Sequence, residues 1–334
     1  MKIIILTTNS EDGEKLKDSL NCLNTDFSSV KNYTKEHLIA HPEKFKEVTF
    51  IFSTWDMPIF TKDEIQEYLP SLKAIFYAAG TVRYFAQQFI NQGIRVFSAA
   101  KSNAIPVAEF VSAQILLANK GYFQAQKEYK KPFWRFSFNK ARNYSLQKNG
   151  NYNAKIGIIG CGAIGARVVD FLKPFKLDII IYDPFLSDKR IQELGAKRAD
   201  LIGIFTNSDV ISNHLPDITE TKGIINRKLL SLMKENATFI NTGRGAQIIE
   251  KDLAKIMRKK PNACALLDVT IKEPVWPWSP LLRRKNIFMT PHIAGSLACE
   301  NDRMAEYMLT AYLNTLAGNT DISEVSIDEL HKQT

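Results

Sequence analysis

The stretch 155–183 constrains the fold of this chain more than any other. It opens on a short apolar run that is typical of a buried parallel strand. Gly160, Gly162 and Gly165 follow in the G-x-G-x-x-G spacing, and a helical apolar pattern begins there. A second apolar run ends on Asp183, close to the ~20-residue offset at which a ribose-binding acid is expected. This order of strand, glycine turn, helix, strand and acid predicts a βαβ unit that binds a dinucleotide.

Each residue of this motif has a physical role. Gly160 permits a tight turn, Gly162 lets backbone N–H groups approach a pyrophosphate, and Gly165 lets helix and strand pack closely. The helix N-terminus adds a partial positive charge that stabilises bound phosphates. Asp183 would accept hydrogen bonds from ribose hydroxyls and would repel a 2′-phosphate. We therefore expect NAD rather than NADP as the cofactor.

Length and composition place the chain among two-domain globular proteins. Its 334 residues can bury two cores, and its 45% hydrophobic and 24% charged residues are ordinary for such a chain. No apolar run approaches the ~20 residues of a membrane span. The cysteines lack the spacing of a metal site, which predicts no bound metal and a reducing, cytoplasmic compartment. They are Cys22, Cys161, Cys264 and Cys299.

The net charge of +9 raises the question of a nucleic-acid partner. Basic and aromatic residues interleave most densely at 127–142. A strip that binds RNA or DNA is one interpretation. A solvated arm or a subunit interface is favoured, because no nucleic-acid motif accompanies the segment. A positive surface also suits an anionic substrate and cofactor, so we expect no nucleic-acid partner and no membrane partner.

The N-terminal third alternates strands and helices, which is typical of a parallel α/β sheet. The predicted strands are 2–6, 48–52, 72–77 and 94–97. Ala79, Gly80 and Thr81 follow the third strand, where ligands of open α/β sheets bind. They form a candidate anion-binding turn, with a plain turn as the alternative. A continuous helix is then expected over 105–129, and a polar linker over 131–153.

Beyond the glycine motif the alternation continues, which predicts a second doubly wound sheet. Further strands are expected at 210–214, 237–241, 263–269 and 287–290. Polar residues end these strands at HLP (214–216), NTGRG (241–245), Asp268 and PHIAG (291–295). The carboxyl ends of parallel strands meet at one edge, where such sheets bind ligands. A helix beyond Cys299 is expected to return to the first domain.

Arg244, Glu273 and His292 are the candidate catalytic residues. Hydride transfer to a 2-oxo acid needs a cation for the carboxylate, an acid/base for the hydroxyl proton and a carboxylate that orients the acid/base. Arginine binds a carboxylate through two hydrogen bonds, and histidine titrates near neutral pH. Each residue could instead be structural: a solvated loop arginine, a surface glutamate, a hydrogen-bonded histidine. Their shared position at strand ends favours the catalytic set.

The chain resembles the D-isomer-specific 2-hydroxyacid dehydrogenase family, which includes phosphoglycerate, D-lactate and glyoxylate/hydroxypyruvate-type enzymes. The resemblance covers most of 70–300, and its motifs follow in the family's order. They are VAEF (107–110), GCGAIG (160–165), HLPDITETKGIIN (214–226), FINTGRG (239–245), LDVTIKEP (267–274) and TPHIAG (290–295). The resemblance implies an NAD-dependent enzyme that interconverts a D-2-hydroxy acid and its 2-oxo acid.

The resemblance also implies roles for single residues. Arg244 matches the family's substrate-binding arginine, Glu273 its histidine-pairing glutamate and His292 its acid/base. Asp183 matches the ribose-binding acid, and Asp268 matches the aspartate near the nicotinamide amide. The other cofactor contacts it implies are Gly160, Gly162, Ala163, Ile164, Gly165, His214, Pro216, Thr242 and Gly295. The substrate contacts it implies, beside Arg244, are Ala79, Gly80 and Thr81.

The family architecture implies two α/β domains, each a doubly wound parallel sheet. A Rossmann NAD-binding domain, 105–297, would be inserted into a flavodoxin-like substrate domain made of 1–104 and 298–334. The resemblance further implies a cleft that closes by hinge motion, and a homodimer.

Two departures from the family pattern leave the substrate open. AAGTVRYF (78–85) replaces the commoner pattern at the substrate turn. Trp276 and Trp278 are an unusual insertion beside Glu273, which either shapes the pocket or packs the loop or the dimer interface. Two rival functions follow. A formate dehydrogenase on the same scaffold would not need Glu273, since formate oxidation releases no hydroxyl proton. An NAD(H)-sensing corepressor with vestigial turnover could keep all three candidate residues.

Overall fold

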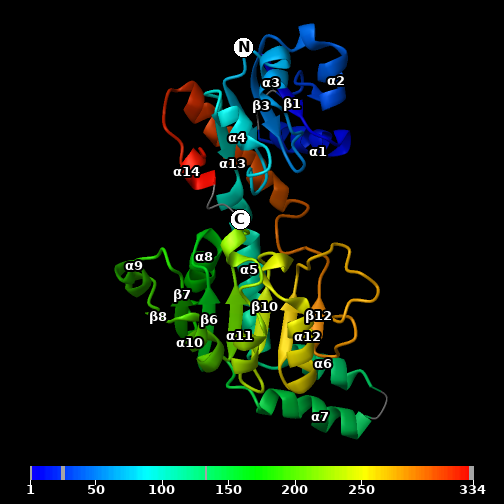
Figure 1. The fold of residues 1–334 in the computed structure, drawn as a ribbon, viewed down its shortest axis with the longest axis vertical. Coiled ribbons are helices and arrows are strands. Elements are labelled where there is room, and N and C mark those ends of the chain that lie inside the picture. Colours follow the sequence, from blue (N-terminus) through cyan, green and yellow to red (C-terminus); the bar gives the residue numbers. More distant parts are fainter. Residues whose placement is uncertain (1, 24–26, 132–133, 331–334) are drawn as a thin grey trace. The chain divides into compact units, whose positions relative to one another are not determined.

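The computed structural model describes residues 2–23, 27–131 and 134–330, and divides the chain into two compact units. The first unit is 1–103 with 296–334, and the second is 104–295. Each unit contains one sheet with helices packed against it (Figure 1). All strand pairs within both sheets are parallel. The predicted fold class, two parallel-sheet α/β domains, is confirmed.

The first sheet has the order β2-β1-β3-β4-β5, the flavodoxin-like order. Its strands are β1 (Lys2–Leu6), β2 (Asn32–Tyr33), β3 (Val48–Ser53), β4 (Ala74–Tyr77) and β5 (Arg95–Ser98). The short edge strand β2 was not predicted, because its two polar residues carry no apolar run. The helices of this unit are α1 (Ser10–Asn21), α2 (Lys35–Ala40), α3 (Lys62–Tyr68), α4 (Ala86–Ile90), α13 (Glu300–Leu316) and α14 (Ile327–Leu330), with a 3₁₀ turn at Pro42–Lys44.

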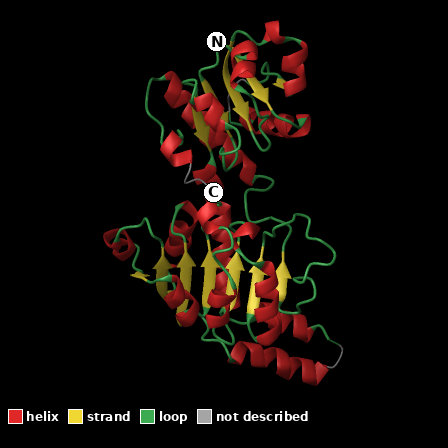
Figure 2. Ribbon diagram, in the orientation of Figure 1, coloured by secondary structure: helices red, strands yellow, loops and turns green. Residues whose placement is uncertain are grey.

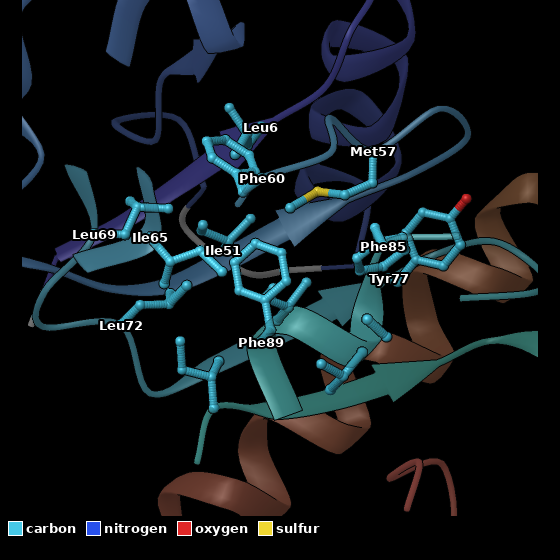
Figure 3. Close-up of a cluster of buried hydrophobic side chains, with 14 of the residues drawn as sticks. Leu6, Ile51, Met57, Phe60, Ile65, Leu69, Leu72, Tyr77, Phe85 and Phe89 are labelled. Carbon is cyan, nitrogen blue, oxygen red and sulfur yellow. The ribbon is translucent and has the colours of Figure 1, made fainter. Parts of the chain in front are cut away.

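Two apolar clusters hold this unit together. On one face, α3 and α4 bury Ile65 and Phe89 against Ile51 of β3 (Figure 3). Helix α3 starts at a capping box, in which Thr61 and Glu64 bond each other's backbone N–H groups. The other cluster joins the phenylalanines of β3 and β4 to α1 and α13. Helix α13 therefore packs in the first unit, although it is distant in sequence from the strands that it contacts.

The second sheet has the order β12-β11-β10-β9-β6-β7-β8. Figure 2 shows its strands pointing the same way. The strands are β6 (Tyr152–Ile159), β7 (Lys176–Tyr182), β8 (Lys197–Arg198), β9 (Val210–Asn213), β10 (Thr238–Asn241), β11 (Cys264–Leu267) and β12 (Ile287–Met289). The order reverses between β6 and β9, as in a Rossmann fold, and ligands of such sheets bind beyond the carboxyl ends at this reversal.

Helices cover this second sheet. They are α5 (Ala100–Ala118), α6 (Tyr122–Tyr129), α7 (Trp134–Leu146), α8 (Ala163–Leu172), α9 (Asp188–Glu193), α10 (Leu201–Asn207), α11 (Arg227–Leu232) and α12 (Glu250–Lys259), with 3₁₀ turns at Thr219–Thr221 and Gly245–Gln247. Consecutive residues of β6 enter different apolar clusters: Ile158 belongs to one and Ile159 to the other. This is the pattern of a strand that is buried on both faces.

Two predictions for 105–153 were wrong. The expected single helix is broken: α5 begins at Ala100, ends at Ala118, and is followed by Gly121 at φ +67° before α6. Only glycine fits there, because a Cβ would lie 2.9 Å from the Tyr144 carbonyl oxygen. The expected polar linker contains α7. Packing against α6 stabilises this helix, a tertiary effect that its polar composition does not reveal.

The packing of α10 on β6 gives a stability prediction. A methyl group at Gly157 would lie 2.8 Å from a methyl carbon of Ile204 and 2.4 Å from the Ser208 hydroxyl oxygen. We expect Gly157→Ala to lower the free energy of unfolding by about 1–3 kcal/mol, as overpacked cores do. Urea unfolding measures this change. Gly162→Ala is the matched control, because a Cβ there meets no atom within 4 Å. Equal stability of the two variants would contradict the close packing.

Candidate active site

The glycine turn lies at the reversal point of the second sheet, after β6. Gly160 has φ +82°, and a Cβ there would lie 2.7 Å from the His214 carbonyl oxygen. A Cβ at Gly165 would lie 2.2 Å from the Gly160 carbonyl oxygen. These two glycines are therefore required by the close approach of the turn to α8 and to the segment after β9.

The residues around this turn fit a dinucleotide. Gly162 faces open space, and no side chain caps α8 behind it, so the first turn of the helix can present its N–H groups to phosphates. Ala163 and Ile164 begin that helix. Asp183 follows β7, and its carboxylate accepts a hydrogen bond from the Cys161 N–H at 2.8 Å. The ribose-type acid thus also fixes the glycine turn. Its Oδ1 accepts the Phe185 and Leu186 N–H groups at 2.8 and 3.0 Å, and Oδ2 keeps acceptor capacity for a hydroxyl group.

Buried polar atoms without partners lie next to this turn. His214 is buried, with its Nε2 2.9 Å from the Ser212 hydroxyl oxygen. Burial lowers the pKa of His214 to about 3, so its ring is neutral. Within the described part of the chain, His214 Nδ1 and Thr242 Oγ1 have no hydrogen-bond partner. Burial of a polar atom is costly unless a protein group, a ligand or a water molecule forms a hydrogen bond with it. The unpartnered atoms of His214 and Thr242 therefore fit a polar ligand beside them, and we call these residues the wall of the cofactor site.

Asp268 organises the loop that carries His292. Its buried carboxylate accepts three hydrogen bonds: from Thr290 Oγ1 at 2.6 Å, Ile293 N–H at 2.9 Å and Ala294 N–H at 2.9 Å. Its carbonyl oxygen accepts the His292 N–H at 3.0 Å. His292 has φ +55°, a left-handed conformation that costs about 1–2 kcal/mol for a residue with a Cβ. The hydrogen bonds to Asp268 offset this strain.

Glu273 and His292 form the one close carboxylate–imidazole pair at this edge among the described residues. Glu273 Oε2 lies 2.7 Å from His292 Nδ1. A carboxylate only accepts, so Nδ1 carries the hydrogen and Nε2 is left for another partner. The other carboxylate oxygen accepts the Thr270 N–H at 3.1 Å, which orients Glu273. Both side chains are about half exposed, so a substrate can reach them.

Arg244 lies on the turn after β10, next to the segment that carries Glu273. A Cβ at Gly245 would lie 2.1 Å from the Thr270 carbonyl carbon, so the two backbones touch. The Arg244 side chain is partly buried, and Nη1 donates to the Gly243 carbonyl oxygen at 2.8 Å. The structure therefore places all three candidate catalytic residues at the carboxyl edge of one sheet.

The candidate turn of the first unit, Ala79 to Thr81, follows β4. The Gly80 carbonyl oxygen accepts the Ser98 hydroxyl at 2.6 Å, which anchors the turn. Within the described residues, the N–H groups of Ala79, Gly80 and Thr81 donate to no protein acceptor. Three free N–H groups in one turn suit an anion. Trp55, which sequence reasoning did not mark, packs here: its ring is 3.6 Å from a Cβ placed on Gly80.

Sequence reasoning also missed three buried amides beside Arg244: Asn213, Asn241 and Gln247. Asn213 and Asn241 end neighbouring strands, which is a signal that could have identified them.

Trp276 and Trp278 pack edge-to-face on each other, with centroids 4.7 Å apart. The described residues contain no group of three or more potential metal-binding side chains. No described helix combines the length and apolarity that a membrane crossing requires.

Comparison with known proteins identifies the family. Residues 112–294 match the family described as "D-isomer specific 2-hydroxyacid dehydrogenase, NAD binding domain". The chain belongs to this family. The match covers more than half of the chain and includes every residue of the glycine turn, Asp183, Arg244, Glu273 and His292. The predicted family and the predicted cofactor, NAD, are confirmed.

Two relatives match this chain in sequence, and the matched part is a different share of each relative's length. D-3-phosphoglycerate dehydrogenase of Archaeoglobus fulgidus is 33% identical over 205 residues, which are 61% of this chain but 38% of that protein. Glyoxylate reductase of Korarchaeum cryptofilum is 29% identical over 265 residues, 79% of this chain and 78% of that protein. The chain thus spans little more than a third of the first relative.

A solved structure shows the fold. The NAD-complexed D-isomer specific 2-hydroxyacid dehydrogenase of Lactobacillus delbrueckii ssp. bulgaricus superposes with a TM-score of 0.77 at 20% identity. The superposition covers 97% of this chain and 100% of the other. At that identity the likeness is one of fold alone.

The open space at Gly162 gives a binding prediction for this family member. We expect Gly162→Ala to weaken NADH binding about tenfold or more, because its methyl group would occupy the space that the pyrophosphate needs. NADH fluorescence titration measures the affinity, and urea unfolding checks that stability is unchanged. Unaltered NADH affinity in the folded variant would place the phosphates elsewhere.

Proposed function

We propose that this chain is an NAD-dependent oxidoreductase that interconverts a D-2-hydroxy acid and its 2-oxo acid. The observation that carries the proposal is the 2.7 Å hydrogen bond between Glu273 and His292, beside the Arg244 turn of an NAD-binding domain. An acid/base, a carboxylate that orients it and a cation are the three groups that this reaction needs from a protein.

In the reducing direction, bound NADH supplies the hydride that the 2-carbonyl carbon receives. His292 donates a proton from Nε2 to the carbonyl oxygen, and it accepts that proton back in the oxidising direction. Glu273 accepts the Nδ1–H of His292, holds the ring in one orientation and stabilises its charged form. Its bond from the Thr270 N–H keeps Glu273 itself in place.

Arg244 binds the substrate carboxylate in this proposal. Its guanidinium presents five donors in a planar fork, which matches a carboxylate with two parallel hydrogen bonds. Among the described residues, Nη1 alone of its donors is committed, to the Gly243 carbonyl oxygen, and the remaining donors are proposed to bind the substrate. In the first unit, the N–H groups of Ala79, Gly80 and Thr81, which donate to no acceptor among the described residues, are proposed as a further anion-binding turn.

The preference for NAD over NADP is proposed from the surroundings of Asp183. Its carboxylate would repel a 2′-phosphate. The nearby Arg198 already donates from Nε, Nη1 and Nη2 to the Asp188 carboxylate and the Asp183 and Leu186 carbonyl oxygens, which leaves fewer of its N–H groups for a 2′-phosphate.

A homodimer in the cytoplasm is part of the proposal, as the family resemblance implies. Four free cysteines, two of them exposed, suit a reducing compartment. The formate dehydrogenase alternative is disfavoured, because Glu273 would have no role in a reaction without a hydroxyl proton. The corepressor alternative has no specific observation in its favour.

The first functional prediction concerns His292. We expect His292→Asn to lower the turnover of the preferred 2-oxo acid by about 10²–10⁴-fold, because the proton donor is lost, while NADH still binds. The assay follows NADH oxidation with glyoxylate, hydroxypyruvate, pyruvate, phenylpyruvate and 2-oxoglutarate. His41→Asn is the control, since this exposed histidine also lies near a glutamate, 3.8 Å from Glu43. Turnover by His292→Asn at the wild-type rate would overturn the proposed role.

The second functional prediction concerns Asp183. We expect Asp183→Asn to raise the NADPH-to-NADH ratio of kcat/KM about tenfold, because removal of the negative charge removes the repulsion of the 2′-phosphate. The asparagine carbonyl oxygen can still accept the Cys161 N–H, while the bonds that Asp183 Oδ1 accepts from the Phe185 and Leu186 N–H groups are lost, so urea unfolding accompanies the assay. Steady-state kinetics with both cofactors measure the ratio, and an unchanged ratio would contradict the charge argument.

A further inference from the structure

Three fully buried amide side chains surround the backbone of Arg244. Asn213 and Asn241 end β9 and β10, where they are register partners, and Gln247 ends the 3₁₀ turn after Arg244. None of the three is exposed to solvent. Burial of an amide is costly unless each of its polar atoms is bonded, so such a cluster persists only where its hydrogen bonds are made within the protein.

These hydrogen bonds converge on the backbone of one residue, Arg244. Gln247 Oε1 accepts the Arg244 N–H at 3.2 Å, and Asn241 Nδ2 donates to the Arg244 carbonyl oxygen at 3.2 Å. Asn213 Nδ2 joins the two, donating to Asn241 Oδ1 at 2.9 Å and to Gln247 Oε1 at 2.5 Å. Both backbone polar groups of Arg244 are therefore held, and we call these three residues the amide clamp.

The clamp also reaches the wall of the cofactor site. Gln247 Nε2 donates to the carbonyl oxygens of Leu215 at 2.6 Å and Pro216 at 3.0 Å. These residues follow His214, whose own carbonyl oxygen contacts the glycine turn at Gly160. One side chain, Gln247, thus ties the Arg244 turn to the segment that packs against the dinucleotide motif.

The clamp explains why residue 243 is glycine. A Cβ at Gly243 would lie 2.7 Å from Gln247 Oε1, 3.3 Å from Asn213 Nδ2 and 3.4 Å from Asn241 Oδ1. All three of its nearest neighbours are atoms of the clamp. A methyl group at 243 would therefore displace the Gln247 amide, the most flexible of the three, from the Arg244 N–H.

We propose that the amide clamp, with Gln247 at its centre, is the positioning device that fixes Arg244 for binding the substrate carboxylate. This proposal rests on the proposed function of Arg244. Gln247 acts through Arg244 and touches neither substrate nor reacting atoms. Loss of the clamp should therefore raise KM for the 2-oxo acid, while kcat and NADH affinity change much less.

The experiment compares wild type with Gln247→Leu, which keeps the volume of the side chain and removes its hydrogen bonds. We expect KM for the 2-oxo acid to rise about tenfold to a hundredfold, with kcat within about threefold, because small misplacements of a binding group cost up to ~10². Hydrogen exchange of the segment 243–247, followed by mass spectrometry, should be faster in the variant. This second readout needs neither substrate nor cofactor.

A double-mutant cycle tests the geometry. Gly243→Ala should raise KM as Gln247→Leu does, because its methyl group displaces the same amide. With Gln247→Ala, which also empties the space beside residue 243, the double variant should be no worse than Gln247→Ala alone, since the amide that the methyl group displaces is gone. Additive effects of the two substitutions on KM would overturn the assigned clash.

Gln247→Glu should make KM for the 2-oxo acid depend on pH in a way that loss of packing alone would not. At neutral pH its second oxygen faces the Leu215 and Pro216 carbonyl oxygens, and repulsion should raise KM. Protonation supplies one O–H donor, so KM should fall back toward the wild-type value as the pH is lowered. A KM ratio of variant to wild type that does not change with pH would contradict the assigned donor role.

Asn286→Leu is the matched control. Asn286 is a buried amide at the start of β12, and its Nδ2 donates to the Met257, Lys260 and Ala263 carbonyl oxygens, away from the Arg244 turn. The Asn286→Leu variant should leave KM for the 2-oxo acid unchanged, although it should lose about as much stability as Gln247→Leu. Absence of turnover of every 2-oxo acid by wild type would count against the proposed function itself. Wild-type turnover with an unchanged KM in Gln247→Leu would instead overturn the clamp alone.

Discussion

The carboxylate of Asp268 is the interaction on which the geometry of the site depends. It accepts three hydrogen bonds from the loop after β12, and its backbone accepts a fourth from His292. These acceptors hold the backbone of His292 in a left-handed conformation that its Cβ disfavours. Strain of this kind persists only where the surroundings over-determine it. The buried Asp268 carboxylate therefore fixes the conformation of the loop. The loop in turn directs the His292 imidazole toward Glu273.

The rest of the edge is assembled by backbone contact rather than by side-chain packing. Gly160 touches the His214 carbonyl group, Gly165 touches Gly160, and Gly245 touches Thr270. The contacts of Gly160 and Gly245 each join the segment after one strand to the segment after another, and the contact of Gly165 joins α8 to the turn that precedes it. A side chain at any of these glycines would separate two segments that each carry candidate site residues. Stability and site geometry are thus coupled along the whole carboxyl edge of the second sheet, because the same close approaches serve both.

Much of this arrangement could be predicted from the sequence, because the governing signals are local. The glycine spacing, the apolar runs and the polar residues at strand ends each depend on a few neighbours in the chain, and they indicated the parallel sheet and its carboxyl edge. The errors came from long-range effects. Helix α7 is stabilised by α6, and Gly121 is required by Tyr144. Gln247 was missed because, apart from the nearby Arg244 N–H, its partners are distant in sequence: Asn213 at the end of β9 and the carbonyl groups that follow it.

The distribution of charge at this edge follows the chemistry of the proposed reaction. His292 must become positively charged during proton transfer, and an anion, Glu273, lies against it. Arg244 must bind an anionic substrate, and a carboxylate against its guanidinium would compete for the same donors. Its backbone is held by neutral amides instead, and among the described residues Arg244 forms no ion pair. A clamp of asparagine and glutamine gives the rigidity of a buried polar network without a competing charge. On this argument the choice of amide over carboxylate at positions 213, 241 and 247 is itself a consequence of what Arg244 has to bind.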